Sequence, residues 1–157
     1  MRLPIHVLAA ACSASLAIAQ CPFASVSMQG HGTGCNPVFA VDPTFGVTLD
    51  TANCRLLLTV SAFPGCCNTF LVGSLLAIGV QPTSIPLPQF GVNCTLLVVP
   101  VILEFQPTAA GSTFVLQLPS TALPPVTLAA QGGALYFTTI GFTYDFALSA
   151  GGQVVLQ

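Results

Sequence analysis

The side chains that could perform acid–base chemistry are few, and they are spread along the chain. Beyond the first twenty residues the one histidine is His31, and the carboxylates are Asp42, Asp50, Glu104 and Asp145. A general acid and a general base must lie close together to act on one substrate. His31 could be a catalytic base or metal ligand on a flexible glycine-rich loop, but we favour a solvent-facing turn residue between glycines. We therefore expect a protein that is not an enzyme and has no catalytic residue.

Motifs for nucleophilic, phosphate or metal chemistry do not accompany this histidine. The chain has no Gly-x-Ser-x-Gly turn, and its glycine-rich run lacks the lysine of a phosphate-binding loop. The acids are not spaced as in a calcium-binding loop, although one cross-strand pair of carboxylates could still bind Ca²⁺. We expect no cofactor and no metal site.

Cysteines are the most informative reactive residues. Six follow the first twenty residues, and an even number in an exported chain predicts a disulfide framework, with buried free thiols as the alternative. Zinc is disfavoured because Cys66 and Cys67 are adjacent and lack the C-x-x-C spacing. Adjacent cysteines pair with each other only under strain, so each should reach a different partner. The six expected disulfide cysteines, whose pairing stays open, are Cys21, Cys35, Cys54, Cys66, Cys67 and Cys94.

Aromatic side chains offer a second kind of site. Tyr136 and Tyr144, with Asp145 beside them, could contact a sugar, because aromatic rings combine an apolar face with a polar group. The chain has no tryptophan, which weakens a carbohydrate site, and its 11 phenylalanines are better explained as core residues. Tyr136, Tyr144 and Asp145 are the candidate ligand contacts.

Composition excludes several classes of protein. Only 4% of the residues are charged and none is lysine, so the chain lacks the basic surface that neutralises nucleic-acid phosphates. With 54% hydrophobic residues it can bury a core and is not disordered. Its 157 residues suit one domain after the leader described next.

The first residues resemble an export signal. Met1 and Arg2 precede an apolar run that ends in Ala17-Ile18-Ala19, the small-x-small pattern of a cleavage site. We predict a signal peptide over residues 1–19 and a single domain over 20–157. Lipid attachment at Cys12 or Cys21 is a poorer match. The most apolar stretch, residues 55–80, is interrupted at 64–68 and is too short on either side to cross a bilayer. The expected location is secreted, extracellular or at the cell surface.

Strands separated by turns must position these residues. Glycine and proline fall between runs rich in Val, Leu, Ile, Phe and Thr, and no run is typical of an amphipathic helix. The pattern predicts an all-β antiparallel β-sandwich, jelly-roll or Ig-like, with nine to ten strands and disulfides in its N-terminal two thirds. Pro100 predicts a bend or an edge position. The expected strands are Val38–Val41, Gly46–Asp50, Arg55–Phe63, Thr69–Val80, Thr95–Gln106, Ser112–Leu118, Val126–Gln131, Ala134–Ile140, Thr143–Leu148 and Gln153–Leu156.

An ordered set of short motifs resembles a known group of domains. The motifs are Gly32–Cys35, Phe70–Gly79, Ile85–Pro88, Asn93–Val98, Ala110–Ser112, Leu116–Leu118, Leu128–Gln131, Ala147–Ser149 and Val154–Val155. Over residues 30–157 this order resembles the small secreted β-domains of exported proteins in planctomycetes and related bacteria. The resemblance implies a β-sandwich outside the cytoplasm and brings no assigned activity. The chain departs from it in lacking tryptophan and in having Cys66-Cys67.

Two classes of function follow. The first is a non-enzymatic structural or interaction protein of the cell exterior, because sheet edges without lysine are open to strand addition and self-association. Its expected partners are further copies of itself or other exported proteins, and not nucleic acid. The second is an extracellular carbohydrate-binding or adhesion module, with polysaccharide as the partner.

Overall fold

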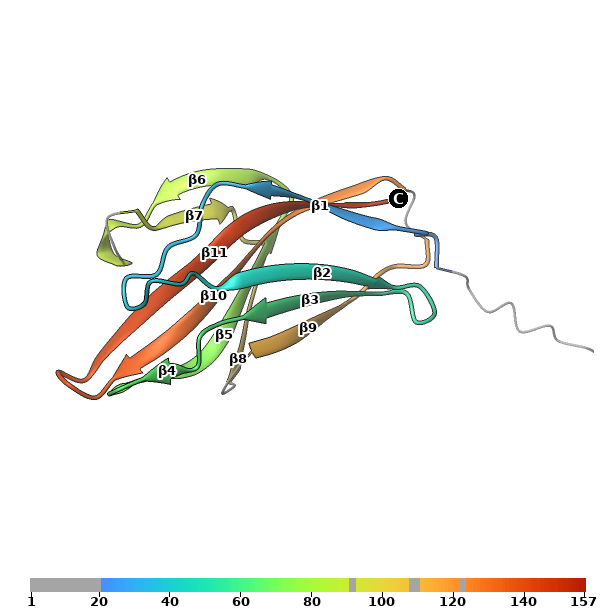
Figure 1. Ribbon diagram of the computed structural model, residues 1–157. Helices are drawn as coiled ribbons and strands as arrows, with labels where there is room; N and C mark the ends of the chain where they lie inside the picture. Colours follow the sequence, from blue (N-terminus) through green and yellow to red (C-terminus); the bar gives the residue numbers. More distant parts are fainter. Residues whose placement is uncertain (1–20, 91–92, 108–110, 122–123) are drawn as a thin grey trace, which may run out of the picture.

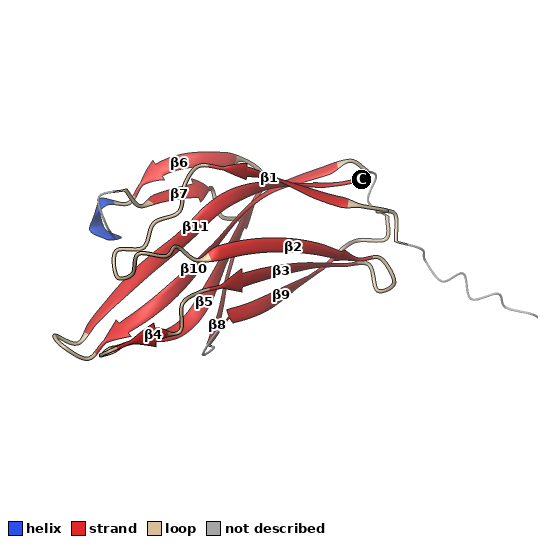
Figure 2. Ribbon diagram, viewed as in Figure 1, coloured by secondary structure: helices blue, strands red, loops and turns tan. Residues whose placement is uncertain are grey.

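The computed structural model describes residues 21–90, 93–107, 111–121 and 124–157, and the predicted signal peptide lies outside this range. The described chain forms eleven β-strands and one short 3-10 helix, η1 (Pro88–Phe90), as Figures 1 and 2 show. All strand pairs are antiparallel. No helix among these residues is long and apolar enough to cross a membrane.

The main sheet is built around a long hairpin. Its strands run in the order β1 (Val26–His31), β11 (Thr143–Leu156), β10 (Val126–Thr138), β5 (Thr69–Gly79) and β4 (Gly65–Cys66). The strand β8 (Ile102–Pro107) also pairs with β5, along residues 73–78. The β10–β11 hairpin, of 13 and 14 residues, extends to one end of the molecule, where β4 lies beside its tip (Figure 1).

A second sheet packs on one face of the main sheet, which we call the inner face. It contains β2 (Thr44–Asp50), β3 (Arg55–Ser61) and β9 (Gly111–Gln117), in that order. In β3 every second residue is buried, because one face of the strand meets the main sheet and the other does not. The core between the sheets includes Leu56, Leu58, Val60, Leu76, Ile78, Phe114, Ala130, Val154 and Leu156.

A two-stranded sheet, β6 (Pro82–Pro86) and β7 (Thr95–Val98), covers part of the opposite or outer face. Val98 packs there against Ala77 and Ala129. Gln131, which is buried, fastens β7 to the main sheet: its Oε1 accepts a hydrogen bond from Leu97 N (2.9 Å), and its Nε2 donates to Thr95 O (3.1 Å). This buried amide satisfies backbone groups that would otherwise face an apolar contact unpaired.

Two disulfides brace the N-terminal two thirds, as predicted. Cys21 pairs with Cys54, with a Cα–Cα distance of 4.9 Å, and Cys35 pairs with Cys94, at 5.1 Å. The other two predicted disulfide cysteines carry free, exposed thiols. The expectation that Cys66 and Cys67 each pair within the chain is therefore wrong, because the four remaining cysteines already satisfy one another.

The predicted fold class is confirmed, with differences in detail. The run expected over 95–106 is divided into β7 and β8 around Pro100. The expected strand Val38–Val41 is a series of bends, and residues 26–31 and 82–86 form strands that were not predicted. Strands expected to be separate are joined in β10 and β11, which continue through their internal glycines.

Candidate functional site

His31 is at an exposed position with a backbone partner. It ends β1, and Gly32 after it has a φ of +66°, so the glycine-rich run is a strand followed by a turn and not one flexible loop. The His31 Nε2 lies 3.3 Å from Thr83 O. The small pocket beside it, of about 160 Å³, is lined also by Gln29, Gly30, Pro82 and Gln153, and no carboxylate is among these residues.

A larger open pocket, of about 470 Å³, lies around the Cys35–Cys94 disulfide. Its one ionisable side chain is Asp42, and the side chain of Asn36 is already used: Oδ1 accepts from two backbone amides and Nδ2 donates to Val41 O at 2.7 Å. Among the described residues no three His, Cys, Asp or Glu side chains come together as metal ligands. The pocket is thus a polar depression with one carboxylate.

Tyr136 is not available to a ligand. Its side chain is 0% exposed, it packs edge-on to Phe39 with ring centroids 5.2 Å apart, and its hydroxyl donates to Phe63 O at 3.0 Å. Burial raises the pKa of this phenol, opposed by its hydrogen bonds. The prediction of Tyr136 as a ligand contact is therefore wrong. Asp145 lies opposite Tyr136 across the β10–β11 pair and is half-buried.

Tyr144, in contrast, belongs to an exposed aromatic surface on the outer face. It is paired with Phe137, which is paired in turn with Phe70 on β5, so three aromatic side chains stand side by side across three strands. Phe137 contacts both Tyr144 and Phe142, with ring centroids 5.0 and 6.3 Å apart. Exposure reaches 54% for Phe70, 62% for Tyr144 and 79% for Phe142.

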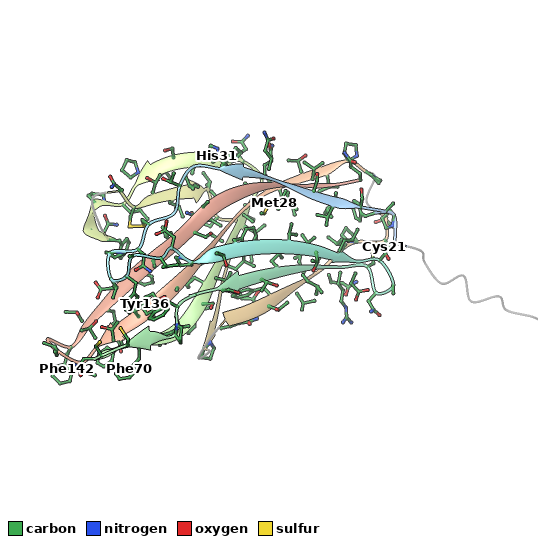
Figure 3. The ribbon with its side chains drawn as sticks, in the orientation of Figure 1. Cys21, Met28, His31, Phe70, Tyr136 and Phe142 are labelled. Atoms are coloured by element: carbon green, nitrogen blue, oxygen red, sulfur yellow. A yellow bond between two sulfur atoms is a disulfide. The ribbon has the colours of Figure 1, made fainter. Side chains whose placement is uncertain are left out.

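This surface continues along the outer face toward β8. Phe105 lies over Gly73, where a Cβ atom would collide with its ring, and Leu103 on the same strand is 69% exposed. We call the set Phe70, Leu103, Phe105, Phe137, Phe142 and Tyr144 the distal apolar face. A contiguous exposed patch of this kind on a soluble domain is typical of an interaction site. Figure 3 shows Phe70 and Phe142 together at the end of the molecule opposite Cys21.

The free thiols lie at the end of β4 (Cys66) and in the turn that leads to β5 (Cys67), at the same end of the molecule. Cys67 has a φ of 63°, and Asn68 N donates to Cys66 O at 2.9 Å. The turn is fixed to the β10–β11 tip, because Asn68 O accepts from Thr139 N (2.8 Å) and from its hydroxyl (3.2 Å). A hydrogen bond with Cys67 raises the pKa of the Cys66 thiol. Since the thiolate is the nucleophile, exchange at Cys66 becomes faster as the pH rises.

The strand β8 leaves one edge of the main sheet open. It pairs with β5 on one side, and no second strand partner is described for it. Five of its six residues are exposed, including Ile102 and Leu103. Its one charge is Glu104, the kind of residue that discourages strand addition. The edge is thus apolar with one acidic residue.

Comparison with protein-family models, with curated proteins and with solved structures finds no match for this chain. The resemblance to exported planctomycete domains accordingly stays a prediction.

Sequence reasoning missed most of the distal apolar face. It assigned the phenylalanines to the core, and Phe114 is indeed buried there, but Phe70, Phe105 and Phe142 are exposed. A signal was present at one place: Ile140-Gly141-Phe142 puts two large apolar residues into a turn between strands, where polar residues are usual. In the structure Ile140 and Phe142 are 71% and 79% exposed.

Proposed function

We propose that this protein is a secreted, non-enzymatic structural or interaction protein of the cell exterior that acts through its sheet edge and its apolar surface. The observation that carries the proposal is the distal apolar face, which continues onto the open edge strand β8. Apolar area that is covered on association is removed from water, and about 25 cal/mol is gained per Å².

The scarcity of charge supports association between like surfaces. The whole sequence has two basic and four acidic residues, so copies approach one another with little electrostatic repulsion. The two disulfides are also typical of an oxidising compartment, which agrees with the predicted export signal. Strand addition at β8 would pair the backbone groups that point away from β5, and it would cover Leu103 and Phe105 in the same step.

A double variant tests this function. In Leu103→Ser with Phe105→Ser, the apolar part of the edge is made polar while β8 keeps its backbone pairing. We expect static light scattering to show self-association of the wild type in the micromolar range and a loss on the order of tenfold in affinity for the variant, or about 1.4 kcal/mol. The control is Val41→Ser with Val80→Ser, two exposed side chains outside the distal apolar face, which should associate like the wild type.

An extracellular carbohydrate-binding or adhesion function is the second candidate, and the exposed ring of Tyr144 beside Phe137 favours it. Sugar rings stack on such aromatic faces. Tyr136 takes no part, because it is buried. Binding to a polysaccharide array that disappears in Tyr144→Ala but persists in Tyr136→Phe would support this function, and a blank array with folded wild-type protein would remove it.

A further inference from the structure

Cys66 and Cys67 are the two described cysteines that the disulfide framework does not use. Both thiols are exposed, at the end of β4 and in the turn after it, and Asn68 in this turn is hydrogen-bonded to the β10–β11 tip. The conditions that keep the other four cysteines paired also oxidise exposed thiols. An exported copy of this chain therefore needs a disulfide partner for each of them.

Pairing of Cys66 with Cys67 in the same chain is geometrically unfavourable. Neighbouring Cα atoms across a trans peptide lie about 3.8 Å apart, whereas disulfides usually join Cα atoms about 4.4 to 6.8 Å apart. The fixed turn, with its hydrogen bond from Asn68 N to Cys66 O, keeps the backbone from adapting easily. The partner thiols therefore come from another molecule.

The surroundings of the turn select a second copy of this chain as that molecule. No charged residue occurs in segments 64–70 and 138–144, which form this end of the molecule, so two copies meet without repulsion. Phe70 and Phe142 supply exposed apolar surface at the same end of the molecule. A two-fold contact also brings the same two cysteines from each side, so that every thiol has a partner.

We propose that this end of the molecule is a covalent self-association site, at which the ends of two copies that carry Phe70 and Phe142 meet and become joined by disulfides between Cys66 of one copy and Cys67 of the other. This inference rests on the proposed interaction function and names its partner and its chemistry. A dimer joined by disulfides does not dissociate when the protein is diluted, whereas a dimer held by apolar contact alone does.

The covalent step is a thiol–disulfide exchange with a disulfide oxidant, either a small molecule such as oxidised glutathione or an oxidoreductase. The thiolate of one copy attacks the oxidant, whose S–S bond breaks and releases one thiol. The thiolate of the second copy then attacks the mixed disulfide and releases the other thiol. For each bond formed, two protein thiols lose two protons and two electrons, and the oxidant gains them.

The test uses the complete chain in a buffer of reduced and oxidised glutathione. We expect a dimer on non-reducing gels that reverts to monomer on reduction, with peptides containing Cys66 and Cys67 crosslinked between chains labelled with different isotopes. Cys66→Ser with Cys67→Ser should give no such dimer, while its fold is preserved because both side chains are exposed. Only an intrachain bond, or only glutathione adducts, would overturn the proposal.

A second pair of variants tests the role of the apolar surface. Phe70→Ser with Phe142→Ser should slow disulfide dimer formation on the order of tenfold, because the encounter that aligns the thiols loses its apolar contact. Val41→Ser with Val80→Ser should form the dimer at the wild-type rate. Equal rates for both variants would show that the thiols react at random, against the proposal.

Light scattering of the Cys66→Ser with Cys67→Ser variant, compared with the wild type, separates this inference from the proposed function. Non-covalent association without disulfide dimers in the wild type would refute the covalent site and leave the interaction function standing. Absence of any association in both proteins would refute the two together.

Discussion

Single residues fall into two groups: buried polar side chains that are hydrogen-bonded, with the Ser74 hydroxyl as an exception, and large apolar side chains that are exposed. Tyr136, Gln131 and Ser149 are buried with hydrogen-bond partners, whereas Phe142 and Tyr144 are exposed and their rings contact Phe137. Buried polar groups of the first kind specify the fold. Exposed apolar groups of the second kind are the ones that a partner would cover.

The buried phenol of Tyr136 makes stability depend on alkaline pH. Because burial raises the pKa of this phenol in the folded state above its usual value of about 10, the folded chain holds the proton more tightly than the unfolded chain. Its contribution is complete below about pH 10 and is lost as the pH rises through the folded pKa. Urea unfolding should show a decline in unfolding free energy above about pH 10.

The matched variants are Tyr136→Phe and Tyr144→Phe. We expect Tyr136→Phe to cost about 1 kcal/mol at neutral pH, because Phe63 O loses its donor, and to reduce the alkaline decline. Tyr144→Phe, which changes an exposed ring, should show the same alkaline decline in unfolding free energy as the wild type. An unchanged decline in Tyr136→Phe would contradict this account.

At the scale of elements, the attachment of β6 and β7 depends on Gln131. Its side chain bonds with Leu97 N, Thr95 O and Ser149 O, and Gln131→Met would leave these backbone groups without that partner. We expect a loss of about 2 to 4 kcal/mol in unfolding free energy. Hydrogen exchange at the Leu97 amide should become faster than at amides of β3.

The control for this variant is Gln29→Met, which replaces an exposed glutamine on β1. It should change the unfolding free energy by less than about 0.5 kcal/mol. Equal effects of the two substitutions would mean that the hydrogen bonds of Gln131 do not hold β7 in place.

The two disulfides connect elements that are distant in sequence. The Cys35–Cys94 bridge spans 59 residues and ties the segment before β7 to the chain that pairs with β11. Closing a loop of this length stabilises a fold by about 4 kcal/mol in the chain-entropy model. Cys35→Ala with Cys94→Ala should lower the unfolding free energy by about that amount, whereas Cys66→Ser with Cys67→Ser should leave it unchanged. The reverse order would contradict the assigned framework.

The alternation of apolar and polar residues, with glycine and proline between the apolar runs, predicted the all-β class, most strand positions and the break at Pro100. They failed at glycines inside the long hairpin. Gly132 and Gly152 divide the predicted strands, but in the structure they are positions of close approach, where a Cβ atom would lie 2.8 Å from side-chain atoms of Val60 and Met28. The sequence does not distinguish a glycine that ends a strand from a glycine that allows a neighbouring side chain to approach closely, because only the packing differs.

The candidate site was harder to predict for a related reason. Periodicity identifies a face that is apolar, but it does not say which end of that face another sheet covers. The β6–β7 sheet covers the outer face at Ala77 and Ala129 and leaves Phe70 and Tyr144 exposed. Likewise the count of six cysteines indicated a framework but not that two of them stay free.

The whole molecule is an elongated sandwich with distinct ends (Figure 1). One end holds Cys21 and its disulfide, and the other holds the β10–β11 tip, the free thiols and much of the distal apolar face. With two basic and four acidic residues in the sequence, long-range electrostatics have little influence on how copies meet. We therefore expect self-association to increase with protein concentration and to change little with salt concentration.

Non-covalent self-association through apolar surface is tested most directly by sedimentation equilibrium of the Cys66→Ser with Cys67→Ser variant at low and high salt. This variant cannot form disulfides between Cys66 and Cys67, so any association that is measured is non-covalent at these positions. The account predicts a weight-average mass that rises above the monomer value across the micromolar range, by the same amount in both salts. A monomer at every concentration and in both salts would contradict it.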